Sequence, residues 1–139
     1  MLKVVIDTNV IYAGLRSRNG ASFQVMQRIG TGQFEMALSV PLLFEYEMIL
    51  KREELPQLNA QDIEDILDYL CAAADARDIF YLWRPYLKDP KDDMLLEVAV
   101  ESNADYIVTF NLQDFRNIGA FGVQAINPQQ LLQRLGDKQ

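Results

Sequence analysis

The fold is decided by the stretch Lys3-Val4-Val5-Ile6-Asp7-Thr8-Asn9-Val10. Its first four residues form a short, largely apolar run, which is typical of a strand buried on both faces of a parallel sheet. Asp7 stands where this strand ends, and ligands of open α/β sheets bind outside the carboxyl ends of the strands. Asp7 is therefore either a cap of the next helix or a site residue, and the pattern by itself favours neither.

Length and composition predict one domain over residues 1–139, because half of the residues are hydrophobic and supply one core. The start of the chain does not resemble a signal peptide, and no apolar run approaches the roughly 18 residues of a membrane span. We therefore expect a cytoplasmic protein with no membrane association. The single cysteine, Cys71, excludes an internal disulfide, and its apolar neighbours predict a buried structural thiol.

The chain contains no histidine, which removes histidine-based catalytic triads and the usual zinc sites. Any metal must then be a hard cation on oxygen ligands, such as Mg²⁺ or Mn²⁺. The net charge of −7 argues against a broad basic face for nucleic acid. Two divalent ions bound by clustered carboxylates would reduce that charge to about −3 and reverse its local sign, so a phosphate substrate remains compatible with the composition.

Strand-like and helix-like segments alternate along the chain, which predicts a parallel sheet with helices on both faces. The expected fold class is α/β, with three layers (α/β/α) and a central, mostly parallel sheet of four or five strands. Strands are expected at residues 3–6, 34–40, 79–83, 106–110 and 122–126. Helices are expected at residues 10–15, 22–29, 41–52, 61–76 and 89–102, and from residue 128 onward.

Acidic residues recur on two of the expected helices. Glu45 and Glu47 flank the apolar stripe of one helix on opposite sides, so periodicity does not choose between them. Asp89 is placed to cap the next helix, and Asp92 and Asp93 in its first turn suit the positive helix end. These two adjacent carboxylates also repel each other, and a bound cation would relieve that repulsion.

A further group of oxygen-bearing side chains follows the strongest strand pattern of the chain. Thr109, Asn111 and Asp114 form either a turn that closes this strand or part of a site. Together with Asp7 and the two acidic helices, they could converge on one edge of one sheet. That arrangement would form an all-oxygen metal site, of the kind that activates water and clamps phosphates in phosphodiester hydrolysis.

With these groups assembled, the sequence resembles the PIN domain family, close to VapC-like ribonucleases, the toxin components of toxin–antitoxin systems. The motifs occur in the family's order over nearly the whole chain, and the set is far more specific than the first motif alone. The matching stretches are Val5–Val10, Leu38–Tyr46, Asp89–Asp93 with Leu96 and Ala99, and Ala104–Phe115.

The resemblance implies a PIN-like fold and a Mg²⁺- or Mn²⁺-dependent endoribonuclease that hydrolyses single-stranded RNA. Our hypothesis for the reaction is in-line attack by a metal-bound water that leaves a 5′-phosphate. The resemblance also implies a cognate antitoxin and a homodimer. By position, Asp7, Glu45 and Asp92 match the family's first three acidic residues, and Asp93 competes with Asp92. At the fourth position many relatives have Asp where this chain has Asn111, which can ligate a metal through its amide oxygen but lacks the charge.

The site residues that follow from this resemblance fall into three roles. The expected catalytic residues are Asp7, Glu45, Asp92 and Asp114, and the expected metal ligands are these four with Asp93 and Asn111. The expected substrate-binding residues are Thr8, Asn9, Thr109, Arg16 and Arg18, with Lys91 a further candidate phosphate contact.

Three other interpretations compete with a ribonuclease. A degenerate, non-catalytic PIN domain acting through a partner protein has Asn111 as its sequence support. A phosphatase of the haloacid dehalogenase type would carry a second Asp two residues after Asp7, where this chain has Asn9. A response-regulator receiver would carry a Lys after a late strand, and the segment from Thr109 to Asn111 offers none.

Overall fold

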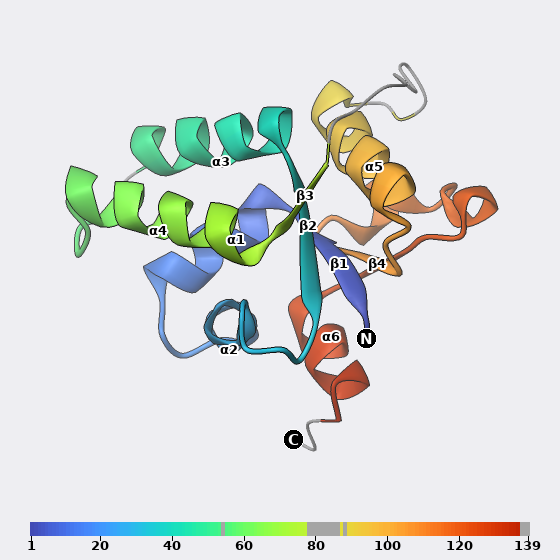
Figure 1. The fold of residues 1–139 in the computed structure, drawn as a ribbon, viewed down its shortest axis with the longest axis horizontal. Coiled ribbons are helices and arrows are strands. Elements are labelled where there is room, and N and C mark those ends of the chain that lie inside the picture. Colours follow the sequence, from blue (N-terminus) through green and yellow to red (C-terminus); the bar gives the residue numbers. More distant parts are fainter. Residues whose placement is uncertain (54, 78–86, 88, 137–139) are drawn as a thin grey trace.

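A computed structural model describes residues 1–53, 55–77, 87 and 89–136. Its centre is a five-stranded, all-parallel sheet in the order β3-β2-β1-β4-β5 (Figure 1). The α/β class, the α/β/α layers and the parallel sheet expected from the sequence are confirmed. The strands are β1 (Lys3–Ile6), β2 (Glu35–Ser39), β3 (Asp75–Arg77), β4 (Tyr106–Val108) and β5 (Gln124–Ile126).

Helices cover both faces of this sheet. In Figure 1, α1 to α4 lie on one side of the strands and α5 lies on the other, where it contacts β1, β2, β3 and β4. α6 packs beside α2. The helices are α1 (Thr8–Arg16), α2 (Ala21–Arg28), α3 (Val40–Arg52), α4 (Ala60–Ala73), α5 (Pro90–Ser102) and α6 (Pro128–Arg134), with short 3₁₀ turns η1 (Leu112–Phe115) and η2 (Gly119–Phe121).

β1 is the central strand, and its apolar run explains that position. Val4, Val5 and Ile6 are fully buried, as expected for a strand with helices on both faces. The order of the strands reverses at β1, because the chain builds β2 and β3 on one side and β4 and β5 on the other. The carboxyl ends of β1 and β4 therefore flank the switch point at which ligands of such sheets bind.

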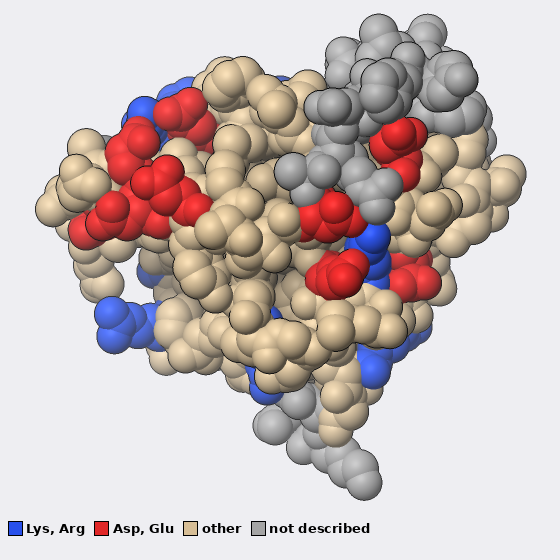
Figure 2. Space-filling model, in the orientation of Figure 1, with Lys and Arg blue, Asp and Glu red and all other residues tan. Residues whose placement is uncertain are grey.

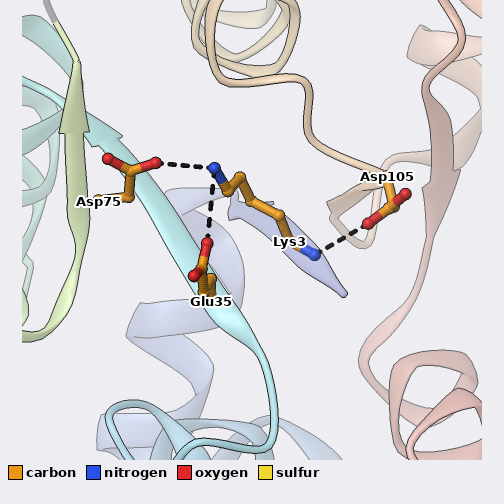
Figure 3. A network of polar contacts seen from close by, with 4 residues as sticks. All are labelled: Lys3, Glu35, Asp75 and Asp105. Atoms are coloured by element: carbon orange, nitrogen blue, oxygen red, sulfur yellow. Dashed lines mark hydrogen bonds and ion pairs between the residues drawn. The ribbon is translucent and has the colours of Figure 1, made fainter. Parts of the chain in front are cut away.

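An ionic network at the start of β1 ties three strands together (Figure 3). The Nζ atom of Lys3 lies 2.8 Å from Oδ2 of Asp75 on β3 and 3.5 Å from Oε2 of Glu35 on β2. The backbone N–H of Lys3 donates to Asp105 Oδ2 at 2.9 Å, just before β4. The Lys3 side chain is 17% exposed, but those of Asp75 and Glu35 are 31% and 52% exposed, so salt screens this network.

The structure corrects the expected elements in one region. The helix expected at residues 61–76 ends at Ala73, and Asp75–Arg77 instead pair with β2 as strand β3. An alanine-rich run has helical propensity, but pairing with the edge of a buried sheet overrides it. The strand expected at residues 79–83 lies outside the described residues. The other boundaries agree to within two residues, as is usual for helix and strand ends.

Cys71 also differs from the sequence expectation. Its side chain is exposed rather than buried. The buried face of α4 is formed by Ile63, Leu67 and Leu70, and Cys71 follows the last of these by about 100° around the helix. None of the helices in the described part of the chain is both long enough and apolar enough to span a membrane.

Candidate active site at the carboxyl end of the sheet

A cavity of about 270 Å³ lies at the switch point, where α1, α3 and α5 begin or pass the carboxyl ends of β1 and β4. Its lining is rich in oxygen-bearing side chains from four separate parts of the chain. The lining residues are Asp7, Thr8, Asn9, Tyr12, Leu42, Glu45, Ile49, Glu53, Asp89, Lys91, Asp92, Leu95 and Asn111. A larger cavity of about 600 Å³ lies against β4 and β5. Among the described residues, Asp105 is its one acidic lining residue, so this cavity does not offer a group of carboxylates.

Asp7 occupies the helix-capping position of α1, yet its side chain makes no capping hydrogen bond. Its Oδ2 atom instead accepts a hydrogen bond of 2.7 Å from Oγ1 of Thr109, which is fully buried at the end of β4. The Thr109 hydroxyl also accepts from the N–H of Asn111 at 3.0 Å. Two neighbouring strand ends are thereby joined through the Asp7 carboxylate.

Burial raises the pKa of Asp7 above its usual value, and the nearby charge of Glu45 adds to the rise. The Thr109 hydroxyl and the backbone amides of Asn9 and Thr8 act in the opposite direction. The carboxylate is thus costly to ionise in this buried position, and a cation beside it would lower that cost.

Glu45 reaches the cavity from α3, with 12% of its side chain exposed. Glu47 points elsewhere and pairs with Lys51 at 2.8 Å on the outer side of the same helix. The choice between these glutamates, which periodicity left open, is made by how α3 packs. Tyr46 between them is fully buried and its hydroxyl donates to the carbonyl of Ile6, which fixes the rotation of α3 against the end of β1.

Asp92 and Asp93 diverge in the first turn of α5. Asp92 lines the cavity and is 8% exposed. Burial raises its pKa to about 7, and the charges of Asp7, Asp89, Asp114 and Asp93 contribute further. Asp93 does not line the cavity; its Oδ1 atom accepts a hydrogen bond of 2.8 Å from the backbone N–H of Leu87. Of the two, the structure places Asp92 with Asp7 and Glu45.

The residues after β4 divide in the same way. Asn111 lines the cavity, whereas Asp114 in η1 is exposed and absent from the lining. The charge of Asp114 still reaches the site, because it raises the pKa of Asp92. The structure therefore places an amide, not a carboxylate, at the fourth position of the cavity.

The expected substrate-binding residues separate into two groups. Thr8 and Asn9 line the cavity, and Oδ1 of Asn9 is buried there without a hydrogen-bond donor in the described part of the chain. Arg16 and Arg18 are exposed near the far end of α1 and do not line it. A nine-residue helix is roughly 13 Å long, which separates Arg16 from Asp7.

Some lining residues were not singled out by sequence reasoning. Glu53 lines the cavity as the residue that ends α3, where the backbone has already left the helical conformation. Helical periodicity therefore gave no signal for it. Asp89 was expected as the cap of α5, and it does accept a hydrogen bond of 3.0 Å from the N–H of Lys91. It also lines the cavity, a second role that its capping position did not indicate.

The donor set fits a hard divalent cation in kind and charge. The cavity offers carboxylate and amide oxygens, the ligands that Mg²⁺ and Mn²⁺ prefer. An unpaired amide oxygen on Asn9 and a carboxyl group of raised pKa on Asp92 are the features that a cation would satisfy. In the described residues, no three acidic or cysteine side chains are yet gathered closely enough to hold one ion. Asp7, Glu45 and Asp92 are the residues that would bind it.

Residues 3–113 match the family model of the PIN domain, and this stretch includes every cavity residue described above. The chain belongs to the PIN domain family. PIN domains are generally nucleases and typically use divalent metals. A comparison with curated protein sequences found no match.

Two solved structures share the fold of this PIN domain. One is the VapBC2 complex of Rickettsia felis bound to a DNA fragment from its promoter, with a TM-score of 0.63 and 13% identity over 91% of this chain and 100% of that chain. The other is FitAB bound to the IR36 DNA fragment, with a TM-score of 0.58 and 19% identity over 90% of this chain and 94% of that chain.

Proposed function

We propose that this PIN domain is a Mg²⁺- or Mn²⁺-dependent endoribonuclease that hydrolyses single-stranded RNA and serves as the toxin of a toxin–antitoxin pair in the cytoplasm. The observation that supports it most directly is the cavity that unites Asp7, Glu45 and Asp92 from three elements at the switch point of the sheet. Membership in a family of nucleases supports the reaction class.

A divalent ion bound there would supply a nucleophilic water and neutralise charge that develops on the phosphate. Side chains of this protein position the oxygen atoms that would surround such an ion. Thr109 donates a hydrogen bond to the Asp7 carboxylate, which orients this group at the cavity wall before an ion binds. Asn9 and Asn111 add neutral amide groups that bind or orient a water or a phosphate oxygen.

The surface charge is consistent with a reaction that depends on a cation. Acidic side chains gather over α3 and α4 on the face shown in Figure 2, where an RNA backbone would be repelled. The electrostatic attraction for a phosphate group would therefore come from the metal ion bound in the cavity. We expect both RNA affinity and cleavage to require the metal, with little binding in a chelator.

A protein partner is also part of the proposal. Both structural relatives are toxin–antitoxin complexes, which supports an antitoxin partner. Val40, Phe44 and Met48 form an exposed apolar row at four-residue spacing on α3, a surface suited to a partner chain or a second copy. Light scattering of the purified chain would test the proposed homodimer, which predicts twice the 15.9 kDa mass.

The two glutamates of α3 provide a matched test of the reaction. Purified protein is incubated with a labelled single-stranded RNA in Mn²⁺ or in EDTA. We expect Mn²⁺-dependent cleavage that Glu45→Gln and Asp7→Asn abolish, whereas Glu47→Gln retains it because Glu47 lies outside the cavity. Cleavage that persists in EDTA, or that Asp7→Asn leaves unchanged, contradicts the proposal.

A second candidate function is a degenerate PIN domain that acts through its partner without catalysis. Two observations favour it: Asn111 in the cavity, and the absence among the described residues of three acids already gathered for an ion. Calorimetric titration discriminates between the two functions. A nuclease binds Mn²⁺ in a manner that requires Asp7, whereas failure of the wild-type chain to bind Mn²⁺ supports the degenerate domain.

A further inference from the structure

Lys91 stands out among the charged residues of the candidate active site. In the part of the chain that the structure describes, it is the one basic residue that lines this cavity, against five acidic ones. Its Nζ atom lies 3.9 Å from Oε2 of Glu45. The pair connects the first turn of α5 with α3, which lie on opposite faces of the sheet.

The two partners of this pair differ in freedom. Glu45 is held inside the cavity with 12% of its side chain exposed, whereas 54% of the Lys91 side chain is exposed at the mouth. A lysine carries a compact charge on a flexible four-carbon stem, so its ammonium group can leave without disturbing the helix that bears it. Glu45 is thus the more buried partner of the pair, and Lys91 the more exposed one.

The acidic side chains around Lys91 explain why a positively charged side chain lies at the mouth of this cavity. Asp7 and Asp92 line the same cavity, and the pKa of each carboxyl group is raised. Burial is the main cause for both, and the charge of Asp7 contributes to the rise at Asp92. Without an ion the site has an excess of negative charge, and Lys91 is the one positively charged residue that lines it among those the structure describes. Its ammonium lies 3.9 Å from Oε2 of Glu45, within ion-pair distance of a carboxylate that a divalent ion would bind.

On the basis of the metal site proposed above, we propose that Lys91 is a built-in counter-ion that competes with the divalent metal for Glu45. In the ion-free protein the Lys91 ammonium pairs with Glu45. Metal binding displaces it, and the ammonium swings toward solvent, on the side from which a phosphate arrives. Lys91 is therefore a positioning residue that sets how tightly the site holds its metal.

The competition has a measurable consequence for affinity. Removing the ammonium frees Glu45 and removes a repulsive charge near the ion, so Lys91→Met should tighten Mn²⁺ binding. The pair is partly exposed, and exposed ion pairs contribute modestly, which corresponds to a change of about two- to five-fold in the dissociation constant. Lys91→Arg keeps the charge and should stay close to the wild-type affinity.

The test is calorimetric titration of the full chain with Mn²⁺, in the absence of RNA, so that the readout is independent of catalysis. Lys51→Met is the matched control. Lys51 on α3 also forms ion pairs, each at 2.8 Å, with two glutamates. These partners, Glu47 on α3 and Glu64 on α4, lie outside the cavity. A further comparison places Lys91→Met in a Glu45→Gln background, where no carboxylate remains for the lysine to occupy.

We expect tighter Mn²⁺ binding in Lys91→Met, no change in Lys51→Met, and no effect of Lys91→Met once Glu45 is Gln. Equal tightening by both lysine variants, or the same tightening in the Glu45→Gln background, would show a general charge effect and overturn the inference. Unchanged affinity in Lys91→Met overturns it while the metal site stands. If the wild-type chain binds no Mn²⁺, the proposed function fails as well, and the two failures are distinguishable.

Discussion

Replacing Asp92 by Asn should make the metal-free protein more stable while weakening its metal site. Asp92 is buried among other carboxylates at the start of α5, and its pKa rises to about 7 from a usual value of 3.8. A carboxyl group whose pKa is raised in the folded state loses stability as pH rises through that pKa. Asn cannot ionise, so the variant escapes this loss.

The size of the effect follows from the pKa. One pKa unit corresponds to about 1.4 kcal/mol, so the full rise would be worth about 4 kcal/mol if the carboxylate were shielded from solvent. Asp92 lines an open cavity, and water there screens its charge. We therefore expect a gain of about 1 to 2 kcal/mol at pH 8, or about 3 to 6 °C in Tm for a chain of this size.

Thermal unfolding in EDTA, measured from pH 4 to pH 8, gives the assay. Near pH 4 the folded-state Asp92 is protonated and resembles Asn, so wild type and variant should unfold at similar temperatures. The difference should grow as pH rises toward 7 and level off above it. Adding Mn²⁺ should reverse the order, because the wild-type chain gains stability from binding and the variant gains less.

Asp93→Asn is the control, because Asp93 lies in the same helical turn but uses its carboxylate to accept the N–H of Leu87. It should gain less stability at pH 8 than Asp92→Asn, because it leaves the Asp92 carboxyl group in place. The reasoning is refuted if Asp92→Asn has the same Tm as wild type at pH 8, or if its gain is already complete at pH 4.

Three other variants test the packing and the site. Thr109→Val removes the hydrogen bond to Asp7 and should weaken Mn²⁺ affinity by about 10- to 100-fold, whereas Thr109→Ser keeps the donor and most of the affinity, as calorimetry would show. Gly14→Ala should cost about 1 to 3 kcal/mol in urea unfolding, because the new methyl group would lie 2.6 Å from Cγ of Met26 and 3.0 Å from a backbone oxygen of α2. An unchanged midpoint would show that α2 moves freely. Lys3→Met should cost about 1 kcal/mol, and its difference from wild type should shrink as salt is raised, since it breaks ion pairs with acidic residues on two neighbouring strands.

The sequence by itself determined the class of this fold and the edge where the site lies. The apolar run of β1 predicts a strand buried on both faces, and its burial confirms this. Alternating patterns predict a parallel sheet, and polar residues after two strands predict which edge carries the chemistry. These features are local or periodic, so they can be read from neighbours along the chain.

The tertiary structure decided which polar side chains share the cavity. Glu45 and Glu47 are equivalent by periodicity, and only the packing of α3 through Tyr46 turns one inward. Asp92 lines the cavity, whereas Asp93 accepts a hydrogen bond from the backbone N–H of Leu87, which lies before α5.

Strand β3 shows the same limit. Its residues read as the end of a helix, yet they form a strand because β2 offers unpaired backbone groups at that place. Pairing of this kind depends on a segment more than thirty residues away, as does the bond between Asp7 and Thr109 across the switch point. The residues around a position in the sequence do not indicate which distant backbone group or side chain completes such a contact. That partner is determined by how the chain packs in three dimensions.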